Sequence, residues 1–177
     1  MIKERGDWIQ TYTGKKFYPL DPRPEDVCIE DIAHALSLIC RYNGHSRVFY
    51  SVAEHSYRMS LAEIRGNPKW FLMHDAAEAF LSDVPRPIKP MLPEFAQIEK
   101  SILKVIGEKF NLGEFDEAEI LNADLIMLAT EKRDVLVFNH INWNVKLPQP
   151  LEDIICPIHP RITESLFLLR ARTLGII

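Results

Sequence analysis

The sequence lacks paired cysteines, long apolar runs and any excess of positive charge. Its cysteines, Cys28, Cys40 and Cys156, are scattered and form no Cys-x-x-Cys pair, which argues against a disulfide framework or a zinc knuckle and fits a reducing compartment. No apolar run approaches the length of a membrane span, and the first residues contain no apolar signal core. We therefore expect a cytoplasmic protein with no membrane partner.

Net charge and length narrow the class of protein further. The formal net charge of −4 argues against a general surface for nucleic-acid polymers, although it allows a local basic pocket for a small anion. A chain of 177 residues, 47% of them hydrophobic, can bury a sizeable core. We assign residues 1–177 to a single domain.

The spacing of apolar residues and the placing of helix-ending residues predict an all-α helical bundle with a short N-terminal β-hairpin. The hairpin is predicted from the alternation around Gly14, followed by a proline-rich stop. Irregular structure is predicted for residues 139–160. Helices are predicted over about 29–41, from the capping box at Ser51 to near Gly66, from Asn67-Pro68 to the proline turn at 83–87, and over about 95–110, 116–134 and 161–173.

The adjacent His74 and Asp75 are the most informative feature, because an imidazole and a carboxylate inside an apolar helical segment are costly without a partner. His55 precedes them and Asp124 follows, each on a predicted helix. Asp124 lies in a nearly apolar stretch, where burying an unpaired carboxylate costs on the order of several kcal/mol. Two imidazoles and two carboxylates suit one divalent ion such as cobalt, manganese or zinc, which we predict as the cofactor.

Each of these residues also has an ordinary structural interpretation. A lone histidine is more often a satisfied core residue than a ligand, and this is the interpretation we prefer for His34. Should His55 be wrongly assigned, His34 and His45 are the substitutes. The charged run 131–134 is most simply a solvated helix face or a set of ion pairs.

The motif set resembles the HD-domain metal-dependent phosphohydrolases, whose pattern of His, His-Asp and Asp is matched by His55, His74-Asp75 and Asp124. The surroundings are similar to small bacterial and phage 5'-deoxynucleotidases and dATP triphosphohydrolases. The interval of 19 residues from His55 to His74 is short for the wider superfamily, so a tight joint between the two helices is expected. The resemblance runs from about residue 12 to 134, in blocks at 40–44, 51–56, 74–78, 83–87 and 123–124.

This resemblance implies an enzyme that cleaves the bond between the 5'-oxygen and the α-phosphorus of a deoxyribonucleotide, releasing a deoxynucleoside together with phosphate or triphosphate. It implies a role in orienting water or substrate for Asp83 and assembly as a homo-oligomer. A carboxylate near a metal-bound group can serve as acid or base, so we expect Glu78 to transfer a proton. The substrate-binding candidates are Arg41, Tyr42, Arg86 and Lys89, with Tyr42 stacking on the base, touching the deoxyribose or packing in the core.

Two other functions fit the same residues. The ligand set can support an HD-type phosphodiesterase or alarmone hydrolase, although the chain has no further His-rich cluster for a two-metal phosphodiesterase. A noncatalytic nucleotide-binding module is the other alternative. The presence of all proposed ligands together with Glu78 argues against a module that has lost its chemistry.

Overall fold

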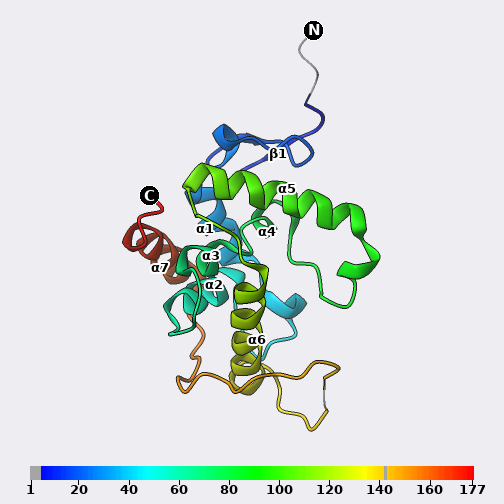
Figure 1. Cartoon of the computed structure of the whole chain (residues 1–177), viewed down its shortest axis with the longest axis vertical. Coiled ribbons are helices and arrows are strands. Elements are labelled where there is room, and N and C mark those ends of the chain that lie inside the picture. Colours follow the sequence, from blue (N-terminus) through cyan, green and yellow to red (C-terminus); the bar gives the residue numbers. More distant parts are fainter. Residues whose placement is uncertain (1–4, 142) are drawn as a thin grey trace.

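The computed structural model describes residues 5–141 and 143–177 and is helical apart from one small two-stranded sheet (Figure 1). The predicted all-α bundle with a short N-terminal hairpin is confirmed. Among the described residues, no helix combines the length and the apolar composition needed to cross a membrane.

The hairpin consists of β1 (Ile9–Gln10) and β2 (Lys16–Phe17), paired antiparallel. Gly14 lies in the turn with a φ of +82°, a conformation that glycine adopts without steric cost. The Phe17 side chain is fully buried and stacks on Phe80, with ring centroids 3.8 Å apart. This stack attaches the hairpin to the helical core.

Helix α1 (Ile29–Leu38) follows a 3-10 turn, η1 (Pro24–Asp26), and is shorter than predicted. The backbone becomes extended at Ile39, and the next residue, Cys40, forms an antiparallel bridge with Ser51. The Arg41 amide then donates to the Tyr50 carbonyl over 2.9 Å. These bonds compete with helix continuation and bring η2 (Arg41–Gly44) beside the start of the next helix.

Helix α2 (Val52–Leu61) begins as predicted, with the Ser51 side chain accepting a hydrogen bond from the Glu54 amide. The predicted His-Asp helix, in contrast, is not continuous. It is divided into α3 (Pro68–Met73) and α4 (Glu78–Leu81) by a segment in which backbone amides bond to carbonyls three residues earlier. His74 and Asp75 lie in this tighter segment, where His74 keeps helical dihedral angles (φ −62°, ψ −32°).

The remaining helices follow the predicted pattern closely. They are α5 (Pro93–Phe110), after a 3-10 turn η3 (Lys89–Met91), α6 (Glu117–Asp134) and α7 (Pro160–Thr173). Asp116 caps α6 by accepting from two backbone amides, and Asn111 ends α5 in the left-handed conformation.

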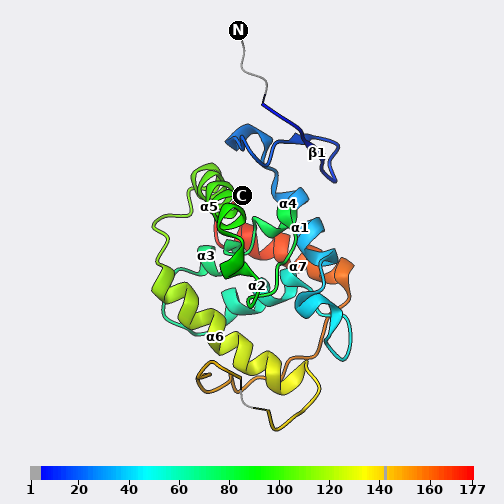
Figure 2. The same ribbon diagram turned by 90° about the vertical axis from the view of Figure 1, so that its right-hand side faces the viewer.

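Helix α2 is central and contacts α1, α3, α6 and α7. Helix α5 crosses one end of the molecule near the hairpin, and α6 extends toward the opposite end (Figures 1 and 2). A second, smaller cluster, including Met59, Phe71 and Met127, packs α6 against α2 and α3. The main core contains buried side chains from most helices, among them Ile32, Leu36, Leu72, Ile102, Ile106 and Phe167.

Replacing Gly66 by alanine is expected to destabilise the fold by about 2–4 kcal/mol, from overpacking and backbone strain together. The backbone φ of Gly66 is +140°, and a Cβ added there would lie 2.4 Å from the Cζ of buried Phe71. Gly14→Ala is the matched control, because its φ is also positive but nothing lies within 4 Å of the added carbon, so that a loss of about 1 kcal/mol is expected. Urea unfolding measures both variants, and equal losses would contradict this account.

Candidate metal centre

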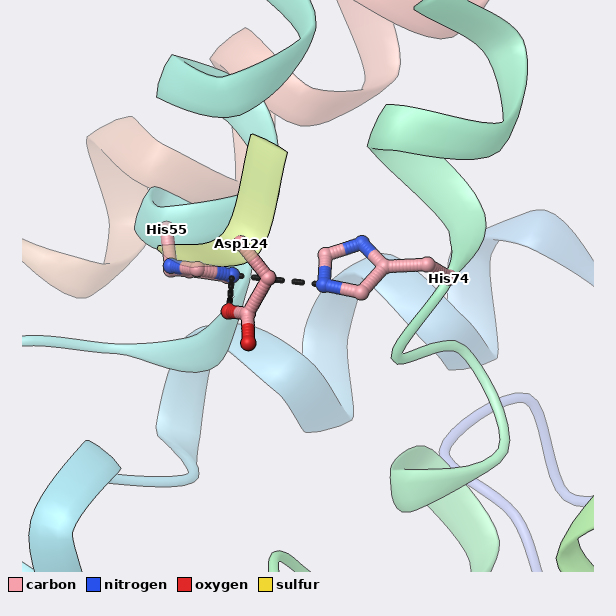
Figure 3. Close-up of side chains that lie close together, drawn as sticks. All are labelled: His55, His74 and Asp124. Atoms are coloured by element: carbon pink, nitrogen blue, oxygen red, sulfur yellow. Dashed lines mark hydrogen bonds and ion pairs between the residues drawn. The ribbon is translucent and has the colours of Figure 1, made fainter. Parts of the chain in front are cut away.

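Three side chains from separate segments lie close together (Figure 3). His55 comes from α2, His74 follows α3, and Asp124 comes from α6. Their nearest donor atoms all lie within 4.8 Å of one another, with His55 Nε2 3.3 Å from His74 Nε2 and 3.4 Å from Asp124 Oδ1. This group can hold a metal ion.

The hydrogen bonds on the outer nitrogens identify which ring nitrogen is free. His74 Nδ1 lies 3.0 Å from the carbonyl oxygen of Phe71, which can only accept, so Nδ1 carries the proton. His55 Nδ1 lies 2.6 Å from Oε1 of Glu131. Burial acts to raise the pKa of Glu131, but Arg41 and His55 lower it to about 2, so this carboxylate is also an acceptor. In the neutral rings, both Nε2 atoms therefore present lone pairs to each other.

Two facing lone pairs at 3.3 Å repel unless a cation or a proton lies between them. Borderline divalent cations take imidazole nitrogen and carboxylate oxygen as ligands, and metal-bound histidines commonly donate their other N–H to a carboxylate or a backbone carbonyl. His55 has the carboxylate partner, Glu131, and His74 has the backbone carbonyl partner, that of Phe71. The donor set therefore fits a divalent metal ion.

Asp75, the fourth predicted ligand, lies against the same group. Its Oδ2 is 3.2 Å from His74 Nε2 and 3.8 Å from His55 Nε2. Burial acts to raise the pKa of Asp75, but His74, His55 and Arg41 lower it below its ordinary value. The carboxylate is thus held ionised beside the two imidazoles.

Asp124 is more accessible than the sequence indicated. We expected a desolvated carboxylate in an apolar stretch, but its side chain is 34% exposed. It faces a cleft of about 700 Å³ between α5 and α6, which His74 and Asp75 also line. The other walls are largely apolar, with Trp70 and Leu103 among them. This volume lies within the range of about 300–1,000 Å³ typical of small-molecule sites.

Arg41 is the cation nearest to the group. Its guanidinium nitrogens lie 3.5 Å from Asp75 Oδ2, 3.9 Å from Asp124 Oδ1 and 3.2 Å from Glu131 Oε2, and its side chain is only 12% exposed. Burial acts to lower the pKa of Arg41, but the surrounding carboxylates raise it well above its usual value. A permanent positive charge therefore adjoins the proposed ligands.

A second cluster lies beside Asp75 at the start of α4. Glu78 is 4% exposed, its Oε1 is 3.7 Å from Lys89 Nζ, and its Oε2 has no hydrogen-bond partner among the described residues. Lys89 also donates to Glu99 over 2.9 Å. Burial and the charge of Asp75 raise the pKa of Glu78 well above its usual value, and burial raises that of Asp83. The protonated form of both carboxyl groups is therefore favoured more than in a solvent-exposed acid.

The other predicted residues are less closely involved. Arg86 is exposed and forms no ion pair within residues 5–141 and 143–177. Tyr42 has a left-handed φ of 56°, and its hydroxyl donates to Glu131. Of the substitutes for His55, His34 is half-buried, pairs with Glu164 and stacks on Tyr12, while His45 is exposed. Neither belongs to the metal-capable group.

Glu131 is the residue that the sequence analysis missed. The run 131–134 was expected to be a solvated face or a set of ion pairs, but the Glu131 side chain is completely buried and accepts hydrogen bonds from His55, Arg41, Tyr42 and Tyr50. One signal was present in the sequence. Residues seven apart share a helix face after two turns, so Glu131 lies on the face of Asp124.

Comparison with known proteins identifies close similarity to two bacterial proteins. The chain is 38% identical over 170 residues to the "Uncharacterized protein YfdR" of Escherichia coli K12, which covers 95% of this chain and 96% of that protein. It is 34% identical over 115 residues to the "Uncharacterized protein RCAP_rcc00048" of Rhodobacter capsulatus, covering 59% of each. No family model matches the chain.

The affinity for a divalent ion is expected to fall as the pH is lowered. Burial acts to lower the pKa of His74, but Asp75 and the Phe71 carbonyl raise it above its ordinary value, so a proton competes with the cation at Nε2. Above the raised pKa the affinity should be constant, and below it the affinity should fall by about tenfold per pH unit for one displaced proton. Calorimetric zinc titrations at pH values above and below the raised pKa of His74 measure this affinity.

His34→Asn is the matched control for this titration, because it removes a histidine outside the metal-capable group. It should leave the pH dependence unchanged. Affinity that does not vary with pH in the unmodified protein would contradict the proposed use of the His74 ring.

Proposed function

The chain belongs to the family of Escherichia coli YfdR, and we propose that it is a divalent-metal-dependent deoxyribonucleotide phosphohydrolase of the HD-domain type. The proposal depends chiefly on one observation, the convergence of His55, His74 and Asp124 beside Asp75 and the buried cation of Arg41. Two imidazoles, two carboxylates and an arginine suit the binding of a metal ion together with a phosphate group.

The residues that would hold the ion are His55, His74, Asp75 and Asp124, with cobalt, manganese or zinc the best match to this mixed nitrogen and oxygen set. A divalent cation bound there supplies Lewis acidity, which lowers the pKa of bound water and withdraws charge from a phosphoryl oxygen. The lowered pKa of Asp75 and the hydrogen bonds at Nδ1 of both rings support this assignment.

Arg41 and Lys89 provide the positive charges for the phosphate. Arg41 lies beside Asp75 and Asp124, and Lys89 lies 3.7 Å from Glu78. A guanidinium can donate two parallel hydrogen bonds to phosphate oxygens, whereas an ammonium acts as a point charge. Contact with either cation would offset part of the charge of a bound phosphate.

Glu78 is the proposed proton donor to the leaving 5'-oxygen. The reaction breaks the bond between that oxygen and the α-phosphorus, forms a bond from a water oxygen to the phosphorus, and transfers one proton to the departing nucleoside. Glu78 suits this role because its buried, unpartnered Oε2 and its raised pKa favour the protonated form. Asp83, whose pKa is also raised, is the proposed residue that orients water or substrate.

The cleft of about 700 Å³ gives the rest of the nucleotide access to the group. Its largely apolar walls favour an uncharged leaving group, and a deoxynucleoside fits that description. The product released with the nucleoside is phosphate from a monophosphate substrate or triphosphate from a triphosphate such as dATP.

The test is to incubate the purified protein and its Asp75→Ala variant with cobalt or manganese and a panel of deoxynucleoside mono- and triphosphates. We expect nucleoside release by the unmodified protein and loss of both metal binding and turnover in the variant, because Asp75 is the carboxylate shared by both imidazoles. Asp153→Ala is the matched control, since its side chain is exposed.

Failure to turn over any nucleotide of the panel would overturn the proposal. Cleavage of cyclic dinucleotides or of a nucleotide 3'-pyrophosphate, without release of nucleosides from 5'-nucleotides, would indicate a phosphodiesterase or alarmone hydrolase. Tight nucleotide binding without turnover in any metal would indicate a noncatalytic module.

Glu78→Gln is expected to retain metal binding but to lower kcat by about 10²–10⁴-fold, the usual contribution of a general acid. The amide preserves shape and hydrogen bonding but cannot give up a proton at neutral pH. Steady-state kinetics and a metal titration of the same preparation measure this, with exposed Glu94→Gln as the matched control. Unchanged kcat would remove Glu78 from the mechanism.

A further inference from the structure

We propose that Glu131 is a positioning residue that fixes His55 for the cation and Arg41 for the phosphate. The inference deepens the proposed function and rests on it for the role of Arg41. For His55 it rests only on the geometry of the metal-capable group. Glu131 would touch neither ion nor substrate and would act through these two side chains.

The two oxygens of Glu131 divide their contacts evenly between the two halves of the site. Oε1 accepts from His55 Nδ1 over 2.6 Å and from the Tyr50 hydroxyl over 3.1 Å. Oε2 accepts from Arg41 Nη2 over 3.2 Å and from the Tyr42 hydroxyl. Each oxygen therefore holds one side chain of the site and one tyrosine.

An ionised carboxylate is the one common side-chain group that suits all of these partners, because every one of them donates. A glutamine of the same shape would carry an NH₂ group in place of one oxygen. That group would face either the N–H of His55 or the donors of Arg41 and Tyr42. Either His55, or Arg41 together with Tyr42, would thus lose its acceptor.

The contact with His55 determines which nitrogen faces the cation. With the proton on Nδ1, Nε2 is left as a lone-pair donor 3.3 Å from His74 Nε2 and 3.4 Å from Asp124 Oδ1. Without Glu131, the ring could place its proton on Nε2 or rotate away. Support of this kind typically changes metal affinity by about 10–100-fold.

The position of Glu131 on α6 also favours a positioning role over a role in fold stability alone. Asp124 and Glu131 lie on one face of the same helix, so α6 supplies both a proposed ligand and the group that orients another. Burying a carboxylate is costly, and apolar residues of similar volume often stabilise a fold as well. A residue that only stabilised the packing of α6 would not need to be charged.

The experiment compares Glu131→Gln with Tyr50→Phe, which removes a hydrogen bond to Oε1 of the same carboxylate but leaves His55 and Arg41 in contact with it. Calorimetric zinc titration should show affinity about 10–100-fold weaker in Glu131→Gln. At saturating zinc, inorganic phosphate should bind about tenfold more weakly, the equivalent of one charge-assisted hydrogen bond. Tyr50→Phe should bind both as the unmodified protein does. Urea unfolding reports the stability of each variant.

Unchanged zinc affinity in folded Glu131→Gln would overturn the proposal, as would an equal loss of zinc affinity in Tyr50→Phe.

Should Glu131→Gln fail to fold, long-range ¹H–¹⁵N NMR of the zinc-loaded, unmodified protein tests which nitrogen of His55 carries the proton. The signal of His55 is identified by its loss in His55→Asn. A proton on Nδ1 is expected, and a proton on Nε2 would overturn the proposal. Zinc affinity and the position of the proton are independent of nucleotide turnover, so inactivity toward nucleotides would defeat the proposed function alone.

Discussion

The site depends on two imidazole rings whose Nε2 atoms face each other at 3.3 Å. The outer nitrogen of each ring donates to an acceptor, Glu131 for His55 and the Phe71 carbonyl for His74. Without a positive charge between them, this arrangement repels. The fold therefore brings together a group that can hold a cation, with the carboxylates of Asp75 and Asp124 beside the two rings.

His74 and Asp75 lie in the tight turns between α3 and α4. There, Asp75 Oδ2 lies 3.2 Å from the Nε2 of His74. The short joint between α2 and α3 brings His55 to the same point, and packing of Met59 and Met127 holds α6 against both.

Charges of alternating sign then surround the group. Arg41 lies between Asp75 and Glu131, and Lys89 lies between Glu78 and Glu99. Among the described residues, five buried side-chain atoms have no hydrogen-bond partner, and two of them, Arg41 Nε and Glu78 Oε2, belong to this site. Buried polar groups are normally satisfied, and an exception can mark a catalytic role or a bound ion.

The sequence by itself determined the hairpin at Gly14, the capping of α2 by Ser51, and the selection of His55, His74 and Asp124 as one group that can hold a metal ion, because turn residues, caps and polar groups in apolar stretches are local signals. Only the tertiary structure decided the end of α1, the break after Met73 and the exposure of Asp124. It also decided the burial of Glu131, whose charged neighbours in the chain resemble an ordinary solvated face. Each of these features arises from contacts between residues distant in the chain, and local sequence patterns do not contain that information.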